Sequence, residues 1–138
     1  MATFRKESAL LEPVTGSLRR RGYSRTQPEV QFFEYSMDLY GYAKRPHKTT
    51  AVELKLTRWM RAFEQALIYQ LCADFVFLAL PMQAAQRVDV PLLERHGIGL
   101  LGVGSGPRCI VLVPAQQSMV VMPSYRDFYV SLMQESRP

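Results

Sequence analysis

The first 56 residues show the hydrophobic pattern of a helix followed by a β-hairpin. Apolar residues recur at helical spacing over residues 8–21, and Gly22 then ends the run. Residues 34–42 are aromatic and apolar around one aspartate, while residues 49–56 alternate and are rich in β-branched side chains. Both segments are typical of strands, and the basic segment between them, residues 43–48, is predicted to be the turn.

A second helix is predicted directly after the hairpin. Thr57 is a suitable cap, and apolar residues then recur on one face. These residues are Met60, Phe63, Leu67 and Leu71. The opposite face carries a polar stripe, which consists of Arg58, Arg61, Gln65 and Tyr69. The apolar face is expected to pack on a sheet, and Asp74 is expected to end the helix.

The remainder of the chain predicts three buried strands and two helices. Three apolar runs are too short for helices and are predicted to be strands: residues 74–81, 97–104 and 109–114. A short helix is expected at residues 91–95 and a terminal helix at residues 125–134. Residues 29–33 are either an earlier part of the first hairpin strand or a separate strand joined by a short bend. This order predicts an α/β fold in which helices flank a mixed sheet.

Length and composition add that the chain forms one domain. Its 138 residues suit a single core, and 48% hydrophobic with 21% charged residues excludes collagen, a coiled coil and wholesale disorder. No apolar run reaches the roughly 18 residues that span a bilayer, and the first residues lack a signal-peptide core, so we expect a cytoplasmic protein without a membrane segment. Cys72 and Cys109 lie in apolar surroundings and are expected to be buried thiols.

Positive charge is concentrated in the first half of the chain. Residues 1–62 contain twelve Lys and Arg against six Asp and Glu, whereas residues 63–138 contain five against six. A localised basic surface favours a polyanionic partner, of which nucleic acid is the commonest. The alternative is that these side chains are scattered and only increase solubility.

Three charged residues interrupt the otherwise apolar hairpin: Asp38, Glu53 and Lys55. Burying an isolated charge is costly unless the charge is paired or bound to a metal, so these residues need compensation. Because side chains alternate along a strand, Glu53 and Lys55 share one face, about 6.6 Å apart, and Asp38 on the partner strand can face Glu53. Two carboxylates and an amine then converge.

This set of side chains suits phosphodiester hydrolysis. Two carboxylates can hold a hard divalent cation such as Mg²⁺, which lowers the pKa of a bound water and stabilises the charge that develops on the phosphate. Lys55 can orient or deprotonate the attacking water and stabilise phosphate oxygens. Gln65, on the next helix, could bind the same water or phosphate. The alternative is a salt bridge between Glu53 and Lys55 on a solvated face of the strand.

At these residues the chain resembles the PD-(D/E)XK nuclease superfamily. The resemblance depends on Met37-Asp38 and, fifteen residues after the aspartate, on Glu53-Leu54-Lys55 at the end of an apolar strand. A helix with Gln65-Ala66-Leu67 and Tyr69 follows, and then an apolar strand, as in many members. Position 37 is Met where the family name has Pro. The match covers residues 10–103 and implies a restriction-endonuclease-like fold, a mixed β-sheet flanked by helices with an αβββαβ core, in one domain over the whole chain.

The resemblance also implies a role for each site residue. Asp38, Glu53 and the backbone carbonyl of Leu54 would be the ligands of a Mg²⁺ or Mn²⁺ ion, and Lys55 would be the catalytic lysine. An additional acid often comes from the first helix in this superfamily, for which the candidate is Glu12, with Glu29 as the second choice. The implied activity is metal-dependent hydrolysis of phosphodiester bonds, with DNA favoured over RNA.

Basic residues around the predicted site are candidates for phosphate contacts. They precede the hairpin, occupy its turn, or follow Lys55 along the helix. They are Arg19, Arg20, Arg21, Lys44, Arg45, Lys48, Arg58 and Arg61. Such contacts would supply affinity without sequence specificity. Specificity would then come from substrate shape, from a homodimer, or from a partner protein in a larger assembly.

Two further interpretations stay open. Some members of the superfamily are catalytically inactive, so the chain could be a module that binds nucleic acid or a partner protein within a larger defence or repair assembly. A regulatory protein without a nucleic-acid role is the third class. Residues 97–102 match the pattern G-x-G-x-x-G, but they lie inside a predicted strand rather than at a strand-to-helix turn, which argues against a dinucleotide site.

Overall fold

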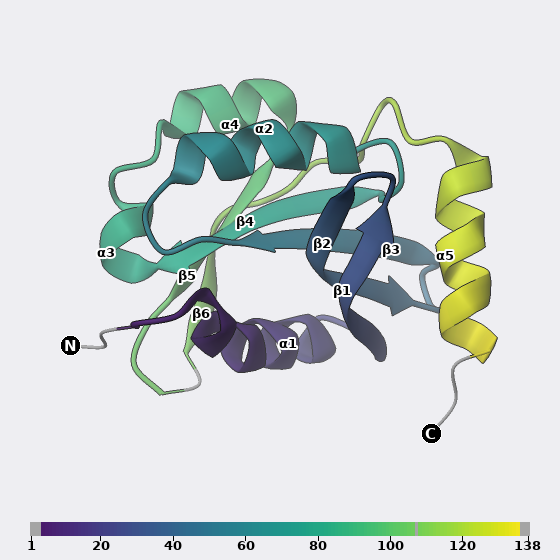
Figure 1. Cartoon of the computed structure of the whole chain (residues 1–138), viewed down its shortest axis with the longest axis horizontal. Helices are drawn as coiled ribbons and strands as arrows, with labels where there is room; N and C mark the ends of the chain where they lie inside the picture. Colours follow the sequence, from purple (N-terminus) through teal and green to yellow (C-terminus); the bar gives the residue numbers. More distant parts are fainter. Residues whose placement is uncertain (1–3, 107, 136–138) are drawn as a thin grey trace.

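The computed structural model describes residues 4–106 and 108–135, which form one mixed sheet of six strands with helices on both faces (Figure 1). The strands lie side by side in sequence order. They are β1 (Arg25–Phe32), β2 (Tyr35–Ala43), β3 (Lys48–Leu54), β4 (Phe75–Pro81), β5 (Gly99–Val103) and β6 (Cys109–Val113). The first three strands are antiparallel, β3, β4 and β5 are parallel, and β6 is antiparallel to β5.

The helices cover the sheet from two sides. They are η1 (Glu7–Leu10), α1 (Leu11–Arg20), α2 (Trp59–Tyr69), α3 (Met82–Ala85), α4 (Val90–His96) and α5 (Pro123–Glu135). Figure 1 shows α1 below the sheet, α2 and α4 above it, and α5 beside the end that carries β1. Because parallel strands need a crossover connection, α2 joins β3 to β4, and α3 and α4 join β4 to β5.

Each face of the sheet has its own apolar core. The core on the α2 side includes Ala51, Val76 and Leu78, and the core on the α1 side includes Val52 and Phe77. Successive residues of β3 and β4 therefore alternate between two buried environments. This explains why β4 is a continuous apolar run in the sequence.

The structure confirms the α/β class, the mixed sheet flanked by helices, and the predicted order of the main elements. Of the two alternatives for residues 29–33, the separate strand is correct, because β1 pairs with β2 through a tight turn. The short helix α3 was not predicted, because residues 82–85 lie at the start of a polar stretch. Cys72 and Cys109 are buried free thiols. Within the described ranges, no helix combines the length and the apolar character needed to cross a bilayer.

The predicted orientation of α2 is right for Phe63, which is buried, and for Leu67, which packs against the core, but wrong for Met60 and Tyr69. Met60 is 48% exposed, although the pattern placed it on the buried face. The buried residues of the helix are Ala62, Phe63, Ala66 and Tyr69. Tyr69 therefore faces the core rather than a polar stripe. Thr57 is not the cap, because Arg58 occupies the N-cap position and makes no side-chain capping bond.

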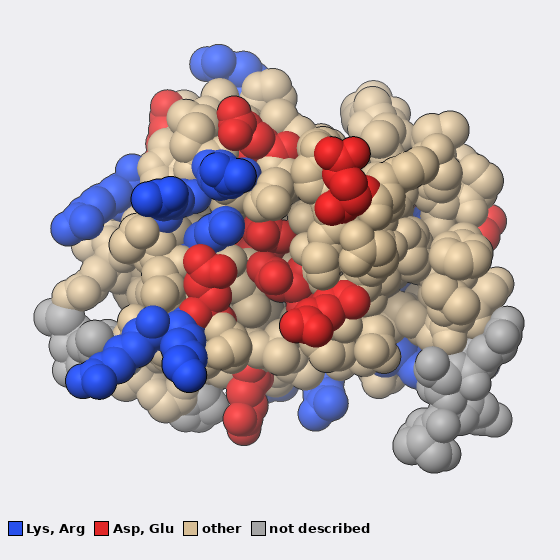
Figure 2. All heavy atoms as spheres, in the orientation of Figure 1, with Lys and Arg blue, Asp and Glu red and all other residues tan. Residues whose placement is uncertain are grey.

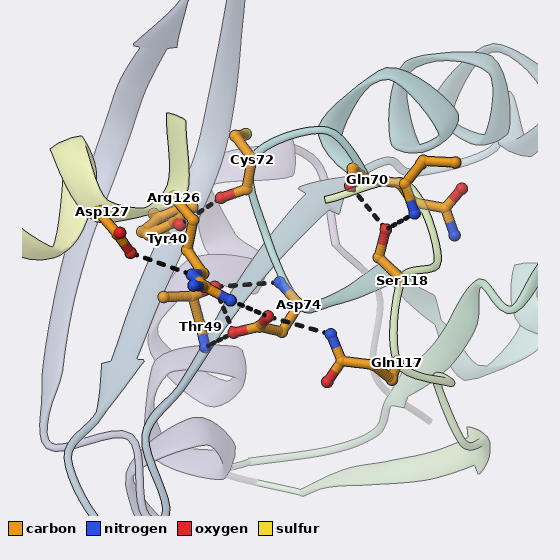
Figure 3. Close-up of polar contacts among 10 residues, drawn as sticks. Tyr40, Thr49, Gln70, Cys72, Asp74, Gln117, Ser118, Arg126 and Asp127 are labelled. Atoms are coloured by element: carbon orange, nitrogen blue, oxygen red, sulfur yellow. Dashed lines mark hydrogen bonds and ion pairs between the residues drawn. The ribbon is translucent and has the colours of Figure 1, made fainter. Parts of the chain in front are cut away.

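Asp74 does not end a helix but joins β3 to the C-terminal segment (Figure 3). This buried carboxylate accepts hydrogen bonds at Oδ2 from the amide and the hydroxyl of Thr49, at 2.8 and 3.0 Å. At Oδ1 it accepts from Gln117, at 3.0 Å, and from Arg126 of α5, at 3.2 Å. Burial acts to raise the pKa of Asp74, but these hydrogen bonds outweigh it and the pKa is lowered. One carboxylate thus fixes α5 to the sheet.

Candidate active site

The β2–β3 hairpin brings Asp38 and Glu53 together. Its ladder ends with the pair Leu39 and Val52, so one further step of the same register places Asp38 opposite Glu53. Beyond this pair, the backbone amide of Leu54 donates a hydrogen bond of 2.7 Å to Oδ2 of Asp38 instead of to a backbone carbonyl of β2. The two acids therefore lie side by side, as the alternation along the strands predicts.

Glu53 is a buried carboxyl group on the α2 face of the sheet. Its side chain is covered by α2, where the hydroxyl of Tyr69 donates a hydrogen bond of 3.1 Å to Oε1. The same hydroxyl lies 3.3 Å from the carbonyl oxygen of Ser36, so Tyr69 connects α2 to both hairpin strands. Val52 and Leu54 belong to the core on the opposite side.

Burial makes both acids difficult to ionise. It is the main reason why the pKa of Glu53 rises from 4.5 to about 8, and the charge of Asp38 adds to the rise. Burial also raises the pKa of Asp38, although the hydrogen bond from the Leu54 amide acts against it. The hydrogen bond between the two carboxyl groups raises the pKa of Glu53 and lowers that of Asp38. Glu53 therefore holds the proton that the pair shares.

Lys55 and Glu7 complete the charges around the pair. Lys55 follows β3 directly, and its positive charge lowers the pKa of both acids. Its backbone amide donates a hydrogen bond of 3.0 Å to the carbonyl of Ala79, which extends the pairing of β3 with β4 by one residue. Glu7, in η1, acts on Asp38 through its own negative charge and raises the pKa of that acid.

The two sequence candidates for an additional acid lie elsewhere. Glu12 lines a groove along α1 together with basic side chains. Glu29 is across from Asp38 in the β1–β2 register, but its backbone is left-handed, with φ 54°, and it lines a pocket beside α5. The acid that does interact with Asp38 is Glu7, because the chain enters the first helix through η1, which contacts β3 and β4.

Gln65 faces the same region of the sheet as Tyr69. It lies one helical turn before Tyr69 on α2, so the two side chains share a face. Its Oε1 atom is buried and has no hydrogen-bond partner among the residues that the structure describes. Leaving a buried acceptor unpaired costs about 1–3 kcal/mol, so a further polar group is expected to pair with this atom.

The basic residues chosen from the sequence do not form one surface. Arg58 and Arg61 are exposed at the start of α2, close in sequence to Lys55. Lys44 and Arg45 are exposed in the hairpin turn, which is roughly 16 Å along the strands from the acid pair. The turn is thus at the end of the hairpin that is remote from the acids.

The remaining basic residues of that set surround the end of α1. Residues 19–21 are exposed there, and the guanidinium of Arg21 lies 5.4 Å from the centre of the Phe77 ring. The ammonium of Lys48 lies 4.9 Å from the centre of the Tyr23 ring. Cations over aromatic rings are stabilised by the ring's negative face, so these two contacts have a structural explanation.

The oxygen atoms at the site suit a hard divalent cation. Figure 2 shows acidic side chains gathered in the middle of one face, with basic side chains to their left. Across residues 4–106 and 108–135, no three His, Cys, Asp or Glu side chains are grouped so that they could hold a metal. The available donors are the Asp38 and Glu53 carboxylates, the Leu54 carbonyl and Gln65 Oε1. All are oxygens, as Mg²⁺ and Mn²⁺ prefer, and a cation between the two carboxylates would compensate their negative charge.

Sequence analysis missed two contributors to the site. Glu7 precedes the apolar pattern of the first helix. The only feature of the sequence that points to its role is its position three residues before Leu10, the first buried residue of the described chain. The sequence pattern places Tyr69 in a polar stripe. The signal for its true direction is the spacing of Ala62, Ala66 and Tyr69, which places two small residues and the ring on one helix face.

Comparison with known proteins identifies a shared fold and no family. No protein-family model matches the chain, and no curated protein matches it. Among solved structures, it is similar to SPO1766, a protein of unknown function from Silicibacter pomeroyi, with 19% identity and a TM-score of 0.73. The similarity covers 97% of this chain and 87% of that chain. At this identity the likeness shows the fold alone.

Proposed function

We propose that this chain is a metal-dependent nuclease that hydrolyses the phosphodiester bonds of DNA. The observation that supports the proposal is the pair of carboxyl groups, the buried Glu53 and the half-buried Asp38, which lie together beside Lys55. Such a pair does not favour folding at neutral pH, because burial and the adjacent charge both oppose ionisation of Glu53. Acids with pKa values raised in this way cluster at functional sites.

The order of the elements supports the resemblance to the PD-(D/E)XK superfamily. The helix α1, the antiparallel strands β1 to β3, the crossover helix α2 and the parallel strand β4 follow one another. Asp38 is on the second strand, and Glu53-Leu54-Lys55 ends the third. We therefore propose that these elements form a restriction-endonuclease-like core.

The site would hold a Mg²⁺ or Mn²⁺ ion through Asp38, Glu53 and the carbonyl of Leu54. When bound, the ion supplies a water of lowered pKa and positive charge beside the scissile phosphate. Glu53 must lose its proton to act as a ligand. Lys55 favours that loss, because its positive charge lowers the pKa of both acids.

The neighbouring side chains bind and orient the reacting groups. The ammonium of Lys55 can donate hydrogen bonds to a phosphate oxygen and stabilise the negative charge that develops there. The unpaired Oε1 of Gln65 can accept a hydrogen bond from the attacking water and orient it. Tyr69 is a positioning residue, because its hydroxyl holds Oε1 of Glu53 in place.

A noncatalytic module of the same fold is the second candidate. The number of ligands favours it, because the described part of the chain offers no group of three or more His, Cys, Asp or Glu side chains for a metal. Such a module would bind DNA or a partner protein within a larger assembly and would not cleave. Its Glu53 would stay protonated at neutral pH and act as a buried, uncharged hydrogen-bond donor to Asp38.

Cleavage assays separate the two candidates. Supercoiled plasmid, linear duplex and single strands are each incubated with the protein in Mg²⁺, Mn²⁺ or EDTA. The chain should cut with either ion and not in EDTA, and Lys55→Ala and Asp38→Asn should each slow cutting by a factor of about 100 or more, as the loss of transition-state charge stabilisation does.

The matched control is Glu94→Gln, which changes an exposed acid on α4 and should leave the rate of cutting unchanged. Binding without cutting under every condition would favour the noncatalytic module. Cutting that persists in both site variants would contradict the assignment of the site.

A further inference from the structure

Large apolar side chains are exposed on α5 and on the turn that joins β1 to β2. They are Phe33 of the turn, Met122 directly before the helix, and Phe128 and Leu132 of the helix. Phe33 is 66% exposed and Phe128 is 57% exposed, so more than half of each side chain is in contact with water. We call these four residues the α5 patch.

The members of the α5 patch are close to one another. Phe33 lies edge-on against Tyr125 of α5, with ring centres 5.6 Å apart, and Phe33 and Phe128 line one pocket of about 390 Å³. Leu132, one helical turn after Phe128, lines a second pocket that shares a lining residue with the first. The carbonyl of Met122 accepts a hydrogen bond of 3.0 Å from the amide of Tyr125. The patch therefore runs from the turn along α5.

Phe33 has an unfavourable backbone conformation. It is the first of the two residues that join β1 to β2, and its φ is 54°. A left-handed backbone at this position favours glycine and is disfavoured for a bulky side chain. The exposed ring gains little from burial within the chain, so the fold alone does not explain a phenylalanine here. Backbone strain of this kind clusters at functional sites, which indicates that the ring contacts another molecule.

The α5 patch is complementary to the same patch on a second copy of the chain. Pro28 and the left-handed Glu29 interrupt the adjacent β1 edge, so an added strand is disfavoured there. A helix with an apolar stripe can instead pack against α5. Tyr125, Phe128 and Leu132 recur at helical spacing, so α5 itself presents such a stripe. The chain thus carries both the surface and the helix that fits it.

The size and the charge of the α5 patch suit the centre of a dimer interface. Phe33 and Phe128 together expose about 200 Å², because an aromatic side chain has about 150–250 Å² of surface. Met122 and Leu132 bring the patch to roughly the few hundred Å² that mark an interaction site. A standard interface buries about 800 Å² per partner around an apolar centre of this kind. None of the four residues is charged, so two copies would meet here without opposing like charges.

We infer that the chain forms a homodimer in which the α5 helices of two copies pack against each other about a two-fold axis, with Phe33 of each copy against the α5 patch of the other. A two-fold interface uses the same surface on both copies, so each side chain of the patch contributes twice. The inference does not depend on the proposed nuclease function, because no residue of the patch belongs to the acid pair.

Sedimentation equilibrium of the purified chain tests the inference. The unmodified chain and three variants are measured at about 1 to 200 µM, a range that covers weak specific dimers. Phe128→Lys places a charge in the α5 patch, and Phe33→Gly removes the exposed ring. The matched control is Val111→Lys, which places the same charge on a partly exposed apolar residue of β6, at the opposite edge of the sheet.

The unmodified chain should change from monomer to dimer within this range. Phe128→Lys should raise the dissociation constant at least about 100-fold, because an unpaired charge is buried on both sides of the interface. Phe33→Gly should raise it about tenfold or more, as the loss of an aromatic anchor does. Its thermal midpoint in dilute solution, where both chains are monomeric, should be similar to that of the unmodified chain, because glycine is favoured in this turn. Val111→Lys should leave the dissociation constant unchanged.

A monomer at every concentration would overturn the homodimer and leave the α5 patch to an apolar helix of a different protein. A dimer that persists in Phe128→Lys and Phe33→Gly would overturn the α5 interface, and its loss in Val111→Lys would assign the contact to β6. A chain that dimerises as expected but does not cut DNA would contradict the proposed function and leave this inference standing.

Discussion

Glu53 links the ionisation of the site to the stability of the fold. Its pKa is about 8 in the folded chain, against 4.5 for an unperturbed carboxyl of this type, so between these values the folded chain keeps a proton that the unfolded chain has lost. The free energy of unfolding therefore falls as the pH rises, by up to about 1.4 kcal/mol per pH unit from this group. Its contribution is fully present below the lower pKa and is lost above the higher one.

Glu53→Gln should remove this pH dependence. The amide has no proton to lose, so in EDTA the variant should lose less stability than the unmodified chain between about pH 5 and pH 8, and it should be the more stable of the two above pH 8. Urea unfolding at a series of pH values measures both curves. If the site binds Mg²⁺ as proposed, the difference at high pH should shrink or reverse in Mg²⁺, because the unmodified chain alone would gain binding energy from the ion. A flat curve for the unmodified chain in EDTA would contradict the shared proton.

Local pattern was enough to predict that three charged residues converge, and not enough to find two of their neighbours. Asp38, Glu53 and Lys55 follow from strand alternation and hairpin register, which act over a few residues. Glu7 reaches Asp38 from a turn that lies outside the helical pattern. The contact of Tyr69 with Glu53 depends on how α2 is rotated on the sheet, which is a tertiary property.

Among the elements, α2 illustrates why a hydrophobic pattern can misplace individual residues of a helix. Ala62 and Ala66 contribute little to the pattern, yet both are fully buried. Their small side chains let the helix approach the sheet closely, and the apolar Met60 is left exposed. The strands of the sheet were easier to locate, because β4 is buried on both faces and apolar along its length, and β3 is rich in β-branched residues.

The contacts of Asp74 could not be predicted, because they join residues up to 52 positions apart. Asp74→Ala should lower the free energy of unfolding by about 3 kcal/mol, since it removes a buried carboxylate and leaves its donors unpaired. Arg126→Ala removes one donor, whose side chain is 24% exposed, and should cost about 1 kcal/mol or less. Urea unfolding near neutral pH gives both values. Equal losses would show that the ion pair with Arg126, rather than the whole hydrogen-bond network of Asp74, holds α5 against the sheet.

For the molecule as a whole, two acids set opposite limits on the pH range of stability. The pKa of Asp74 is lowered, so its contribution is present above its ordinary value of 3.8 and is lost as the pH falls below it. Glu53 acts in the other direction, with a contribution that is lost as the pH rises toward about 8. Without a divalent cation, the fold should therefore be favoured by mildly acidic conditions.

The two edges of the sheet differ in their protection against other strands. β1 carries Pro28 and the charged Glu29, both of which oppose pairing with a further strand. β6 has no charged residue. Its register shift against β5 is a feature that can hinder pairing with a further strand. Three consecutive apolar residues of β6 are between 36% and 41% exposed. They are Ile110, Val111 and Leu112.

Val111→Lys should make the β6 edge less prone to aggregation. A lysine on an edge strand disfavours pairing with another chain, so light scattering on heating should decrease. The free energy of unfolding should change by about 0.5 kcal/mol or less, because the side chain is already partly exposed. Unchanged scattering would indicate that the register shift alone protects the edge.

The proton shared by Asp38 and Glu53 gives the chain a built-in sensitivity to acidity. A cation bound at the proposed site would displace about one proton per molecule at neutral pH, so its uptake would acidify an unbuffered solution. Acid and magnesium would thus compete for the same two side chains. At low pH and low magnesium concentration the proposed cation site would be empty and the two acids protonated. As the pH or the magnesium concentration rises, the site would fill without a conformational change.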